Sequence, residues 1–581
     1  MFRKAFKSSW LLAAACAVIG CQPPMPGEED PSFGQGASAL RGREVFQLKD
    51  LHPMYSSNPR NMVEVNRTLY FNARVDEGEE LWKSDGTPGG TKLVRDIFPG
   101  WVGSEPELLT SFRNQLFFVA DDGEGGRELW KSDGRFSGTV RVKDIHPGPS
   151  GSSPNALTVV NDTLYFFADD GSSGQELWRS DGTAEGTIRV KDINPGVGDG
   201  SLESLTAVGN TLFFSADDGL TGAELWKSDG TAAGTVRVRN IRASGDSAPS
   251  ELVAMNGRLF FSANDGIHGR ELWVSDGTEA GTVLLQDIDP GSASGFPAHL
   301  VAVNGVLFFN GWGPEGQELW KSDGTRDGTV LVKDIIPYWG SNPMWLTAVN
   351  NTLFFVALDG VHGDELWKSD GTAAGTVMVK QIIPGTQSGS PTQLFNAGGT
   401  LVFTANDGVT GEELWTSDGT AAGTTLLADL RPGERGSEPR ELSMFRGLLV
   451  FSANDGTSYH EPWAIGDHTA PVVRCPAPVS VAAAGPDGAV VTFAPAEVEE
   501  AITASPEVSW SHASGSTFPV GTTEVTASAT DDAGNVGSCS FTVTVTGTKT
   551  GSGCSATGTG TALGWLALLL VPALLRRRAS A

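Results

Sequence analysis

The chain has 581 residues, of which 39% are hydrophobic, 19% are charged and 74 are glycine, and its formal net charge is −28. This length predicts more than one domain, and a composition rich in turn formers favours short strands over helices. The acidity argues against a nucleic-acid partner, because such a surface repels phosphate backbones. We expect it to serve solubility outside the cell, with calcium binding as the alternative.

Residues 1–43 have the pattern of an export signal followed by a tether. A basic start precedes an apolar run in residues 1–20, which predicts a signal peptide. The run ends in Val18-Ile19-Gly20-Cys21 and resembles a bacterial lipobox, which implies a lipid on Cys21. An ordinary cleaved signal is the alternative. Residues 21–43 are rich in Pro, Gly and Glu and predict a flexible tether.

A repeat fills residues 44–467. The string ELWKSDGT recurs with small changes, and its tryptophans are spaced by 47 or 48 residues. Four short apolar runs make up each unit, for example 205–208, 211–216, 224–228 and 235–241, and Asn/Asp-Gly turn signals separate them. Four antiparallel strands in such a length are typical of one propeller blade. The nine repeat tryptophans are Trp82, Trp130, Trp178, Trp226, Trp273, Trp320, Trp367, Trp415 and Trp463.

The phase of the repeat predicts how the ring closes. Residues 44–51 match the fourth run of the other units, and no fourth run follows Trp463. We therefore predict an all-β fold, a β-propeller of about nine four-stranded blades whose N-terminal strand closes the ring, followed by an immunoglobulin-like β-sandwich. Nine exceeds the usual four to eight blades, so an open superhelix is the alternative. The repeat tryptophans are expected to fill the gaps between blades and to act as structural anchors.

The repeat resembles the ELWxxDGT family of bacterial surface proteins. This resemblance covers residues 44–467 and implies no assigned chemistry for any residue. Units one and six depart from the pattern in the second turn, where they read Arg74-Val75-Asp76 and Gly311-Trp312-Gly313.

Residues 468–547 change character. Alternating runs at 524–529 and 540–545 predict strands of a β-sandwich. The segment closely resembles a hyalin-repeat (HYR) domain, which implies an immunoglobulin-like module associated with adhesion or with spacing other domains. The matching positions are Cys475-Pro476, Phe518-Pro519, Gly521-Thr522-Thr523, Asp531, Gly534-Asn535 and Cys539.

The C-terminal end is tripartite. Residues 548–561 form a Gly/Ser/Thr linker that holds Cys554, and residues 562–575 are apolar and predict a short transmembrane segment. The basic tail 576–581 follows and begins with Arg576, Arg577 and Arg578. This arrangement resembles the myxobacterial C-terminal sorting signal, which implies processing near Cys554 and retention on the cell surface. With the other cysteines in terminal segments, Cys475 and Cys539 remain as an even pair and predict one disulfide.

The sequence lacks HExxH, GxSxG, P-loop and CxxC motifs, so it predicts neither a catalytic residue nor a metal or cofactor. The Asp-Asp-Gly carboxylates after the second run are expected to shape turns, and calcium binding would require several of them to converge. The candidate ligand-binding residues are aromatic and fall outside the repeat pattern, in turns and links of one face; packing beneath the loops is the alternative. They are Trp101, Trp312, Tyr338, Trp339 and Trp345.

Together these features predict an exported, non-enzymatic binding or adhesion protein anchored at the outer membrane or cell surface. Membrane attachment is expected through the N-terminal lipid, the C-terminal sorting signal or both. The ligand is expected to be a polysaccharide or another surface protein. The alternatives are a polysaccharide-acting hydrolase or lyase and a purely structural coat protein. An enzyme is expected to break the repeat symmetry with polar residues facing the axis, and no such set is evident from the sequence.

Overall fold

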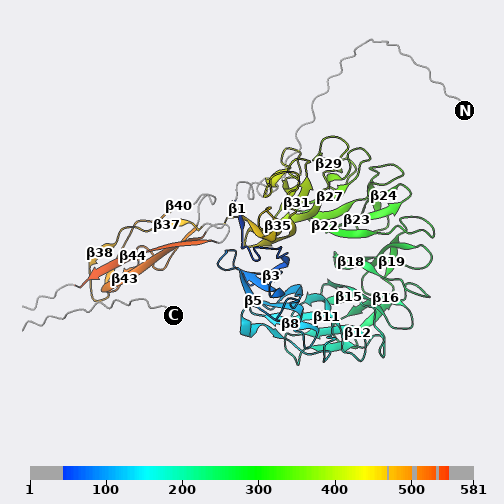
Figure 1. The fold of residues 1–581 in the computed structure, drawn as a ribbon, viewed down its shortest axis with the longest axis horizontal. Helices are drawn as coiled ribbons and strands as arrows, with labels where there is room; N and C mark the ends of the chain where they lie inside the picture. The colour runs from blue at the N-terminus through cyan, green and yellow to red at the C-terminus, as the bar shows by residue number, and fades with distance from the viewer. Residues whose placement is uncertain (1–43, 468–469, 500–506, 531–534, 548–581) are drawn as a thin grey trace, which may run out of the picture. The chain divides into compact units, whose positions relative to one another are not determined.

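The computed structural model describes residues 44–467, 470–499, 507–530 and 535–547. These residues divide near residue 469 into two compact units, each described by itself below (Figure 1). The predicted signal peptide, Cys21, the tether, the linker with Cys554, the apolar segment and Arg576, Arg577 and Arg578 lie outside the described residues. Within the described ranges, no helix is both long and apolar enough to cross a membrane.

The first unit is built from nine four-stranded antiparallel sheets within residues 44–467. Blades one to three are β2 (Arg60–Val65), β3 (Thr68–Val75), β4 (Gly78–Ser84), β5 (Lys92–Arg95); β6 (Glu107–Phe112), β7 (Gln115–Asp121), β8 (Arg127–Ser132), β9 (Val140–Arg141), with a 3-10 turn at Phe136–Gly138; and β10 (Asn155–Val160), β11 (Thr163–Asp169), β12 (Gln175–Ser180), β13 (Ile188–Lys191). Blades four to six are β14 (Glu203–Val208), β15 (Thr211–Asp217), β16 (Ala223–Ser228), β17 (Val236–Arg239); β18 (Ser250–Met255), β19 (Arg258–Asn264), β20 (Arg270–Ser275), β21 (Val283–Gln286); and β22 (Ala298–Val303), β23 (Val306–Gly313), β24 (Gly316–Ser322), β25 (Val330–Lys333). Blades seven to nine are β26 (Met344–Val349), β27 (Thr352–Ala357), β28 (Glu365–Ser369), β29 (Val377–Lys380); β30 (Thr392–Ala397), β31 (Thr400–Asn406), β32 (Glu412–Ser417), β33 (Thr425–Ala428); and β34 (Arg440–Phe445), β35 (Leu448–Asn454), β36 (His460–Gly466), β1 (Glu44–Gln47).

The ring closes through the N-terminal strand. β1 pairs antiparallel with β36, with Glu44 opposite Gly466 and Gln47 opposite Trp463, so it supplies the fourth strand of blade nine. The first strands of neighbouring blades contact one another in an unbroken cycle from β2 to β34 and back to β2 (Figure 1). The predicted all-β propeller and its closing strand are therefore confirmed, and the open superhelix is excluded.

The repeat tryptophans lie between blades. Eight of the nine are buried, and Trp463 is half-buried. Trp226, for example, packs in one cluster with Phe167 and Leu177 of blade three and with Phe214 of its own blade. Each indole therefore joins two sheets that share no backbone hydrogen bonds.

The glutamate of each ELW motif ties its blade to the following link. Buried Glu224 accepts hydrogen bonds from the Ile241 N–H at 2.8 Å, from the Arg242 N–H at 3.1 Å and from the Ser247 hydroxyl at 2.8 Å. Burial raises the pKa of Glu224, while these donors oppose the rise. In blade nine Glu461 makes the matching bonds to the Leu51 N–H and to Ser57, so it holds the chain that has just closed the ring.

The second unit is a small β-sandwich with a disulfide. Its sheets are β38-β44-β43-β41, β37-β40 and β39-β42, and Cys475 is bonded to Cys539 with a Cα–Cα distance of 5.7 Å, so the predicted disulfide is confirmed. Phe518, Val525 and Phe541 are buried in its core. The strands are β37 (Val472–Arg474), β38 (Val479–Ala482), β39 (Ala489–Val490), β40 (Glu497–Glu499), β41 (Glu507–Trp510), β42 (Thr517–Phe518), β43 (Gly521–Thr530) and β44 (Val536–Thr546).

Candidate functional site: the link face of the propeller

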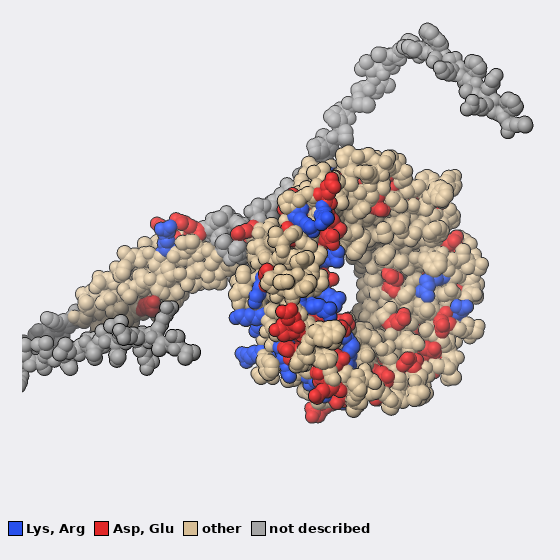
Figure 2. Space-filling view, in the orientation of Figure 1, with Lys and Arg blue, Asp and Glu red and all other residues tan. Residues whose placement is uncertain are grey.

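One face of the propeller carries the irregular side chains. In each up-and-down blade, the turn between the second and third strands lies on the same side as the link that leads to the next blade. We call this side the link face. The first strands line the central opening and begin on this face, and the space-filling view shows the ring hollowed at its centre (Figure 2).

A bulge at the start of every first strand shapes the rim of the opening. The register shifts after the first residue, and the second residue takes a positive φ in all nine blades, for example 55° at Trp345. Because the repeat imposes this conformation, the side chain at this position varies freely from blade to blade. The nine rim residues are Asn61, Leu108, Ala156, Ser204, Glu251, His299, Trp345, Gln393 and Glu441.

Blades six and seven present a group of exposed aromatic side chains. We define the aromatic arc as Phe296, Trp312, Tyr338, Trp339 and Trp345, whose exposed fractions are 60%, 47%, 88%, 84% and 45%. Phe296, Tyr338 and Trp339 are thus largely exposed, whereas Trp312 and Trp345 are about half covered by neighbouring residues. The tryptophan pattern of the sequence does not single out Phe296. Its Gly-Phe-Pro setting in a link is the signal that could have identified it.

Short-range contacts hold the aromatic arc in place. A tight turn joins β23 to β24, with Gly313 opposite Gly316, in place of the longer Asp-Asp-Gly loop. The link from blade six to blade seven packs directly on this hairpin. It passes so close at Gly340 that an added Cβ there would lie only 2.2 Å from the Gln317 nitrogen. The Asn342 N–H also donates to the Gln317 carbonyl at 3.0 Å, and Gln317 lies opposite Trp312 in the hairpin. Trp312 and Trp339 thus belong to one fixed scaffold.

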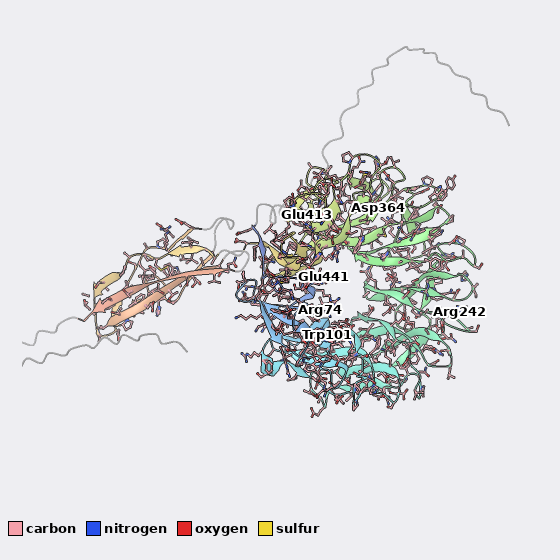
Figure 3. The ribbon with its side chains drawn as sticks, viewed as in Figure 1. Arg74, Trp101, Arg242, Asp364, Glu413 and Glu441 are labelled. Atoms are coloured by element: carbon pink, nitrogen blue, oxygen red, sulfur yellow. A yellow bond between two sulfur atoms is a disulfide. The ribbon has the colours of Figure 1, made fainter. Side chains whose placement is uncertain are left out.

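Trp101 does not join this group. It is 79% exposed and lies in the link between blades one and two. Figure 3 places Glu441, Arg74 and Trp101 on one side of the central opening and Arg242, of the blade four to five link, on the other. The five predicted aromatic residues therefore share a face but occupy two separate regions of it.

The second region is a pocket at the seam where blade nine meets blade one. Its volume is about 540 Å³, within the range of about 300–1,000 Å³ common for ligand sites. Charged side chains gather on this side of the opening (Figure 2). We define the seam pocket by its lining residues, which are Asn58, Pro59, Arg60, Arg74, Glu79, Glu105, Arg440, Glu441, Ser452 and His460.

Most carboxylates of the seam pocket are already engaged. The Arg60 guanidinium donates to both carboxylate oxygens of Glu79, with Nη2–O distances of 2.7 and 2.9 Å, and Asn72 donates to the same carboxylate. This bonding raises the pKa of Arg60. The Asn61 N–H donates to Glu441 at 3.0 Å across the seam. These bonds fix the walls of the pocket and tie blade one to blade nine.

Three other lining residues of the pocket are less tightly bonded than Glu79. Among the described residues, the exposed Arg74 guanidinium forms no hydrogen bond or ion pair, and the Ser452 hydroxyl forms none either. Burial lowers the pKa of His460, and the nearby Arg440 lowers it further. The nearby Glu438 carboxylate, 3.7 Å from the His460 Nε2, opposes this lowering. The imidazole is therefore neutral at pH 7, and a neutral ring can donate one hydrogen bond and accept one.

The seam pocket is the polar break in the repeat symmetry that the sequence alone did not reveal. Its residues come from opposite ends of the propeller, for instance Arg60 and Arg440, and only ring closure brings them together. The sequence did carry one signal of this pocket. Blades one and six are the units with the departing second turn, and that turn carries Arg74 in one and Trp312 in the other, at equivalent positions of the hairpin.

The Asp-Asp-Gly carboxylates bond within their own turns. Asp218, for example, accepts hydrogen bonds from the Leu220 and Thr221 N–H groups at 3.0 and 2.8 Å and pairs with Arg237 at 3.2 Å. The carboxylates stay on separate blades, and the described residues contain no group of three or more potential metal ligands. These bonds explain the aspartates as turn residues.

Comparisons with known proteins bear on the two units differently. No curated protein matches the sequence. A puromycin hydrolase is similar at 13% identity and a TM-score of 0.34, and the match covers 77% of this chain and 65% of that one. A puromycin-hydrolysing peptidase of Mycobacterium tuberculosis is similar at 11% identity and a TM-score of 0.35, with 78% of this chain and 64% of that one covered. The β-propeller domain of the Trilobed protease of Pyrococcus furiosus is similar at 11% identity and a TM-score of 0.30, with 55% of this chain and 95% of that one covered. The chain spans less than two-thirds of the first two, and likenesses this distant say nothing about activity. The HYR domain family matches residues 466–545, so the C-terminal unit has both the sequence pattern and the disulfide-bonded sandwich expected of that domain.

Proposed function

We propose that the protein is an exported, surface-anchored, non-enzymatic adhesion protein that binds polysaccharide on the link face of its propeller. The observation that carries the proposal is the aromatic arc, five exposed rings on one rigid stretch of two neighbouring blades. Flat faces of Trp and Tyr stack on the apolar faces of sugar rings, and a rigid scaffold lowers the entropy lost on binding. The HYR domain supports an adhesive role, since such modules are typical of cell-surface proteins.

The extent of the aromatic arc supports a polymeric ligand over a small molecule. The aromatic arc spans the link between blades six and seven and reaches the rim of the opening at Trp345. Several separate rings along such a path can contact successive sugars of one chain, so that weak contacts add up. Another surface protein would also find apolar area here, and it is the second possible ligand of the same face.

An enzyme that acts on polysaccharide is the second candidate function, favoured by the polar seam pocket. The bonding within the pocket argues for binding instead. Glu79 is held by both Arg60 and Asn72, and Glu441 accepts the Asn61 N–H, so neither is placed as a free proton carrier. Export and anchoring rest on the sequence patterns of the two ends.

A glycan-array and calorimetry experiment tests the proposal. Purified chain is screened against bacterial polysaccharides, and the best ligand is titrated into the wild type and into Trp339→Ala, Trp345→Ala and the double variant. Each ring is expected to contribute about 1–2 kcal/mol, so the double variant loses about 30-fold or more in affinity. The matched control is Phe136→Ala, an exposed ring outside the link face that follows the third strand of blade two.

Two results would overturn the proposal. One is a ligand whose affinity is unchanged in the double variant. The other is the steady appearance of new reducing ends or unsaturated products when wild-type protein is incubated with that polysaccharide, which would favour the enzyme.

A further inference from the structure

The seam pocket lies across the ring from the aromatic arc, and its chemistry differs. Blade one and blade six are separated by about half of the nine blades in either direction. At the seam three guanidinium groups, Arg60, Arg74 and Arg440, line one pocket of an otherwise acidic protein. We propose that the seam pocket binds a carboxylate-bearing sugar, so that the polysaccharide recognised by the link face is a polyuronate. This inference rests on the proposed function and names its ligand class.

The arginines of the pocket are the groups that can bind the ligand's carboxylate. Arg60 is committed to Glu79, and Arg440 pairs with Glu438 at 2.8 Å in an exposed ion pair. Arg74 has no such partner among the described residues and stands at the exposed end of β3. A guanidinium binds a carboxylate through two parallel hydrogen bonds, which gives both affinity and orientation. Arg74 is therefore the main contact for the ligand's charge.

The remaining lining suits hydroxyl groups. The carboxylates of Glu105 and Glu441 accept hydrogen bonds, the Ser452 hydroxyl and the neutral His460 ring can do both, and Asn58 adds an amide. A uronic acid has one carboxylate and several hydroxyls on each ring, so it matches both sets. An acidic peptide offers carboxylates without sugar hydroxyls, so it could satisfy Arg74 but not the side chains that suit hydroxyl groups.

Trp101 adds a stacking surface near the pocket. It lies in the same link as Glu105, and that link is joined to blade one by the Glu105 N–H, which donates to the Glu79 carbonyl at 3.1 Å. The ring is 79% exposed and on the same side of the opening as Arg74 (Figure 3). The seam thus holds a cation for the carboxylate and an aromatic face for the sugar.

The net charge of −28 opposes a polyanion only at long range. At physiological ionic strength the Debye length is about 8 Å, so distant carboxylates are screened and the side chains within the pocket decide binding. The affinity for a polyuronate is therefore expected to be measurable at about 0.15 M salt, which is the physiological ionic strength. It is expected to fall at higher salt because the arginine contact itself weakens.

The test uses trigalacturonate, polygalacturonate, dextran and poly-glutamate as probes in calorimetry with the full chain. We expect the wild type to bind both galacturonates, and Arg74→Met to weaken trigalacturonate by about tenfold or more because a charged hydrogen bond is lost. Arg74→Lys should recover part of the affinity. The control is Arg242→Met, which removes a guanidinium from a link across the opening whose Nη1 donates only to the Asp246 carbonyl among the described residues. It should change the affinity less than about twofold.

The outcomes separate the inference from the function on which it rests. If dextran and polygalacturonate bind equally and Arg74→Met changes neither, polysaccharide binding stands and the uronate pocket is wrong. Poly-glutamate binding as tightly as polygalacturonate would contradict the sugar assignment. Absence of any trigalacturonate binding would likewise overturn it. If no polysaccharide binds at all, the proposed function fails as well. Because Arg74 is exposed, melting curves of its variants should match the wild type, which keeps a loss of binding interpretable.

Discussion

The seam between blades nine and one and the aromatic arc of blades six and seven arise from the same change in the repeat. Both contain a blade that replaces the Asp-Asp-Gly loop by a tight two-residue turn, closed by Val75 and Gly78 in blade one and by Gly313 and Gly316 in blade six. Arg74 is the last residue but one of β3 in the first hairpin, and Trp312 holds the same position of β23 in the other. This propeller therefore builds distinct surfaces by altering one turn while the buried framework stays constant.

The two regions differ in how the framework holds them. The link of the aromatic arc continues directly from blade six, and Glu318 fixes it through the Ile336 N–H at 3.0 Å and the Ser341 hydroxyl. At the seam Glu461 makes the same kind of bonds to residues some 400 positions away in sequence. The aromatic arc thus depends on local chain connectivity, whereas the seam depends on closure of the ring.

The largest expected effect separates framework from surface within blade six. Trp320→Ala removes a buried anchor between blades five and six and should cost about 3–5 kcal/mol of unfolding free energy. Trp312→Ala, on the facing strand of the same hairpin, should change stability by less than about 0.5 kcal/mol while weakening polysaccharide binding. Denaturant unfolding and calorimetric binding measure the two effects. If both variants lost equal stability, the division of tryptophans into anchors and ligand contacts would fail.

The next largest effect compares Glu461 at the seam with Glu318 at the link of the aromatic arc. Glu461→Ala leaves several buried donors unsatisfied and loosens the strand that closes the ring, and it should cost about 3 kcal/mol or more. Glu318→Ala loses similar bonds but leaves the chain continuous, so its cost should be smaller, about 2 kcal/mol. Hydrogen exchange of residues 44–57 should rise only in Glu461→Ala. Equal exchange in both variants would contradict the account of the seam.

The third expected effect is the pH dependence of stability, to which both regions contribute. Burial raises the pKa of Glu271, whose carboxylate holds the link that carries Phe296, and of Glu461 at the seam, to about 7 in each case. A carboxyl group whose folded pKa is raised stabilises the fold below its unfolded pKa, and this contribution is lost as pH rises through the folded value. Melting temperature should therefore increase as pH falls from about 8 to about 5.

The aspartates of the turns set the lower limit of this range. Burial opposes ionisation of Asp170, but hydrogen bonds from Ser172 and Ser173 prevail and lower its pKa to about 2. Its contribution to stability is present above the unfolded pKa and is lost as pH falls through the folded value, so stability should decline again below about pH 4. Glu365→Gln offers a control, because the pKa of Glu365 is also raised to about 7, and its Oε1 has no hydrogen-bond partner of normal geometry within the described ranges. This variant should show a shallower rise between pH 8 and 5, and an unchanged slope would count against the buried glutamates as its cause.

The sequence predicts the framework of this protein better than its surface. The tryptophan spacing and the Gly-containing turns report local geometry that every blade repeats, so the blade plan and the closing strand follow directly from them. The same holds for Cys475 and Cys539, the even pair left after the terminal cysteines are set aside. Arg440 and His460 gave no such signal, because each is ordinary in its own unit and becomes part of a pocket only when the first and last blades meet. Arg74 lies in a turn that departs from the repeat, but the sequence did not show that this turn lines a pocket with residues of blade nine.

The central claim is that the link face is the binding surface, and hydrogen exchange of the full chain with its tightest-binding polysaccharide tests it most directly. We predict slower exchange in the links at residues 52–59, 96–106 and 334–343, and no change in the Ser-Asp-Gly-Thr turns at 84–87 and 322–325 on the opposite face. Slower exchange confined to those turns, or to the HYR domain, would contradict the account.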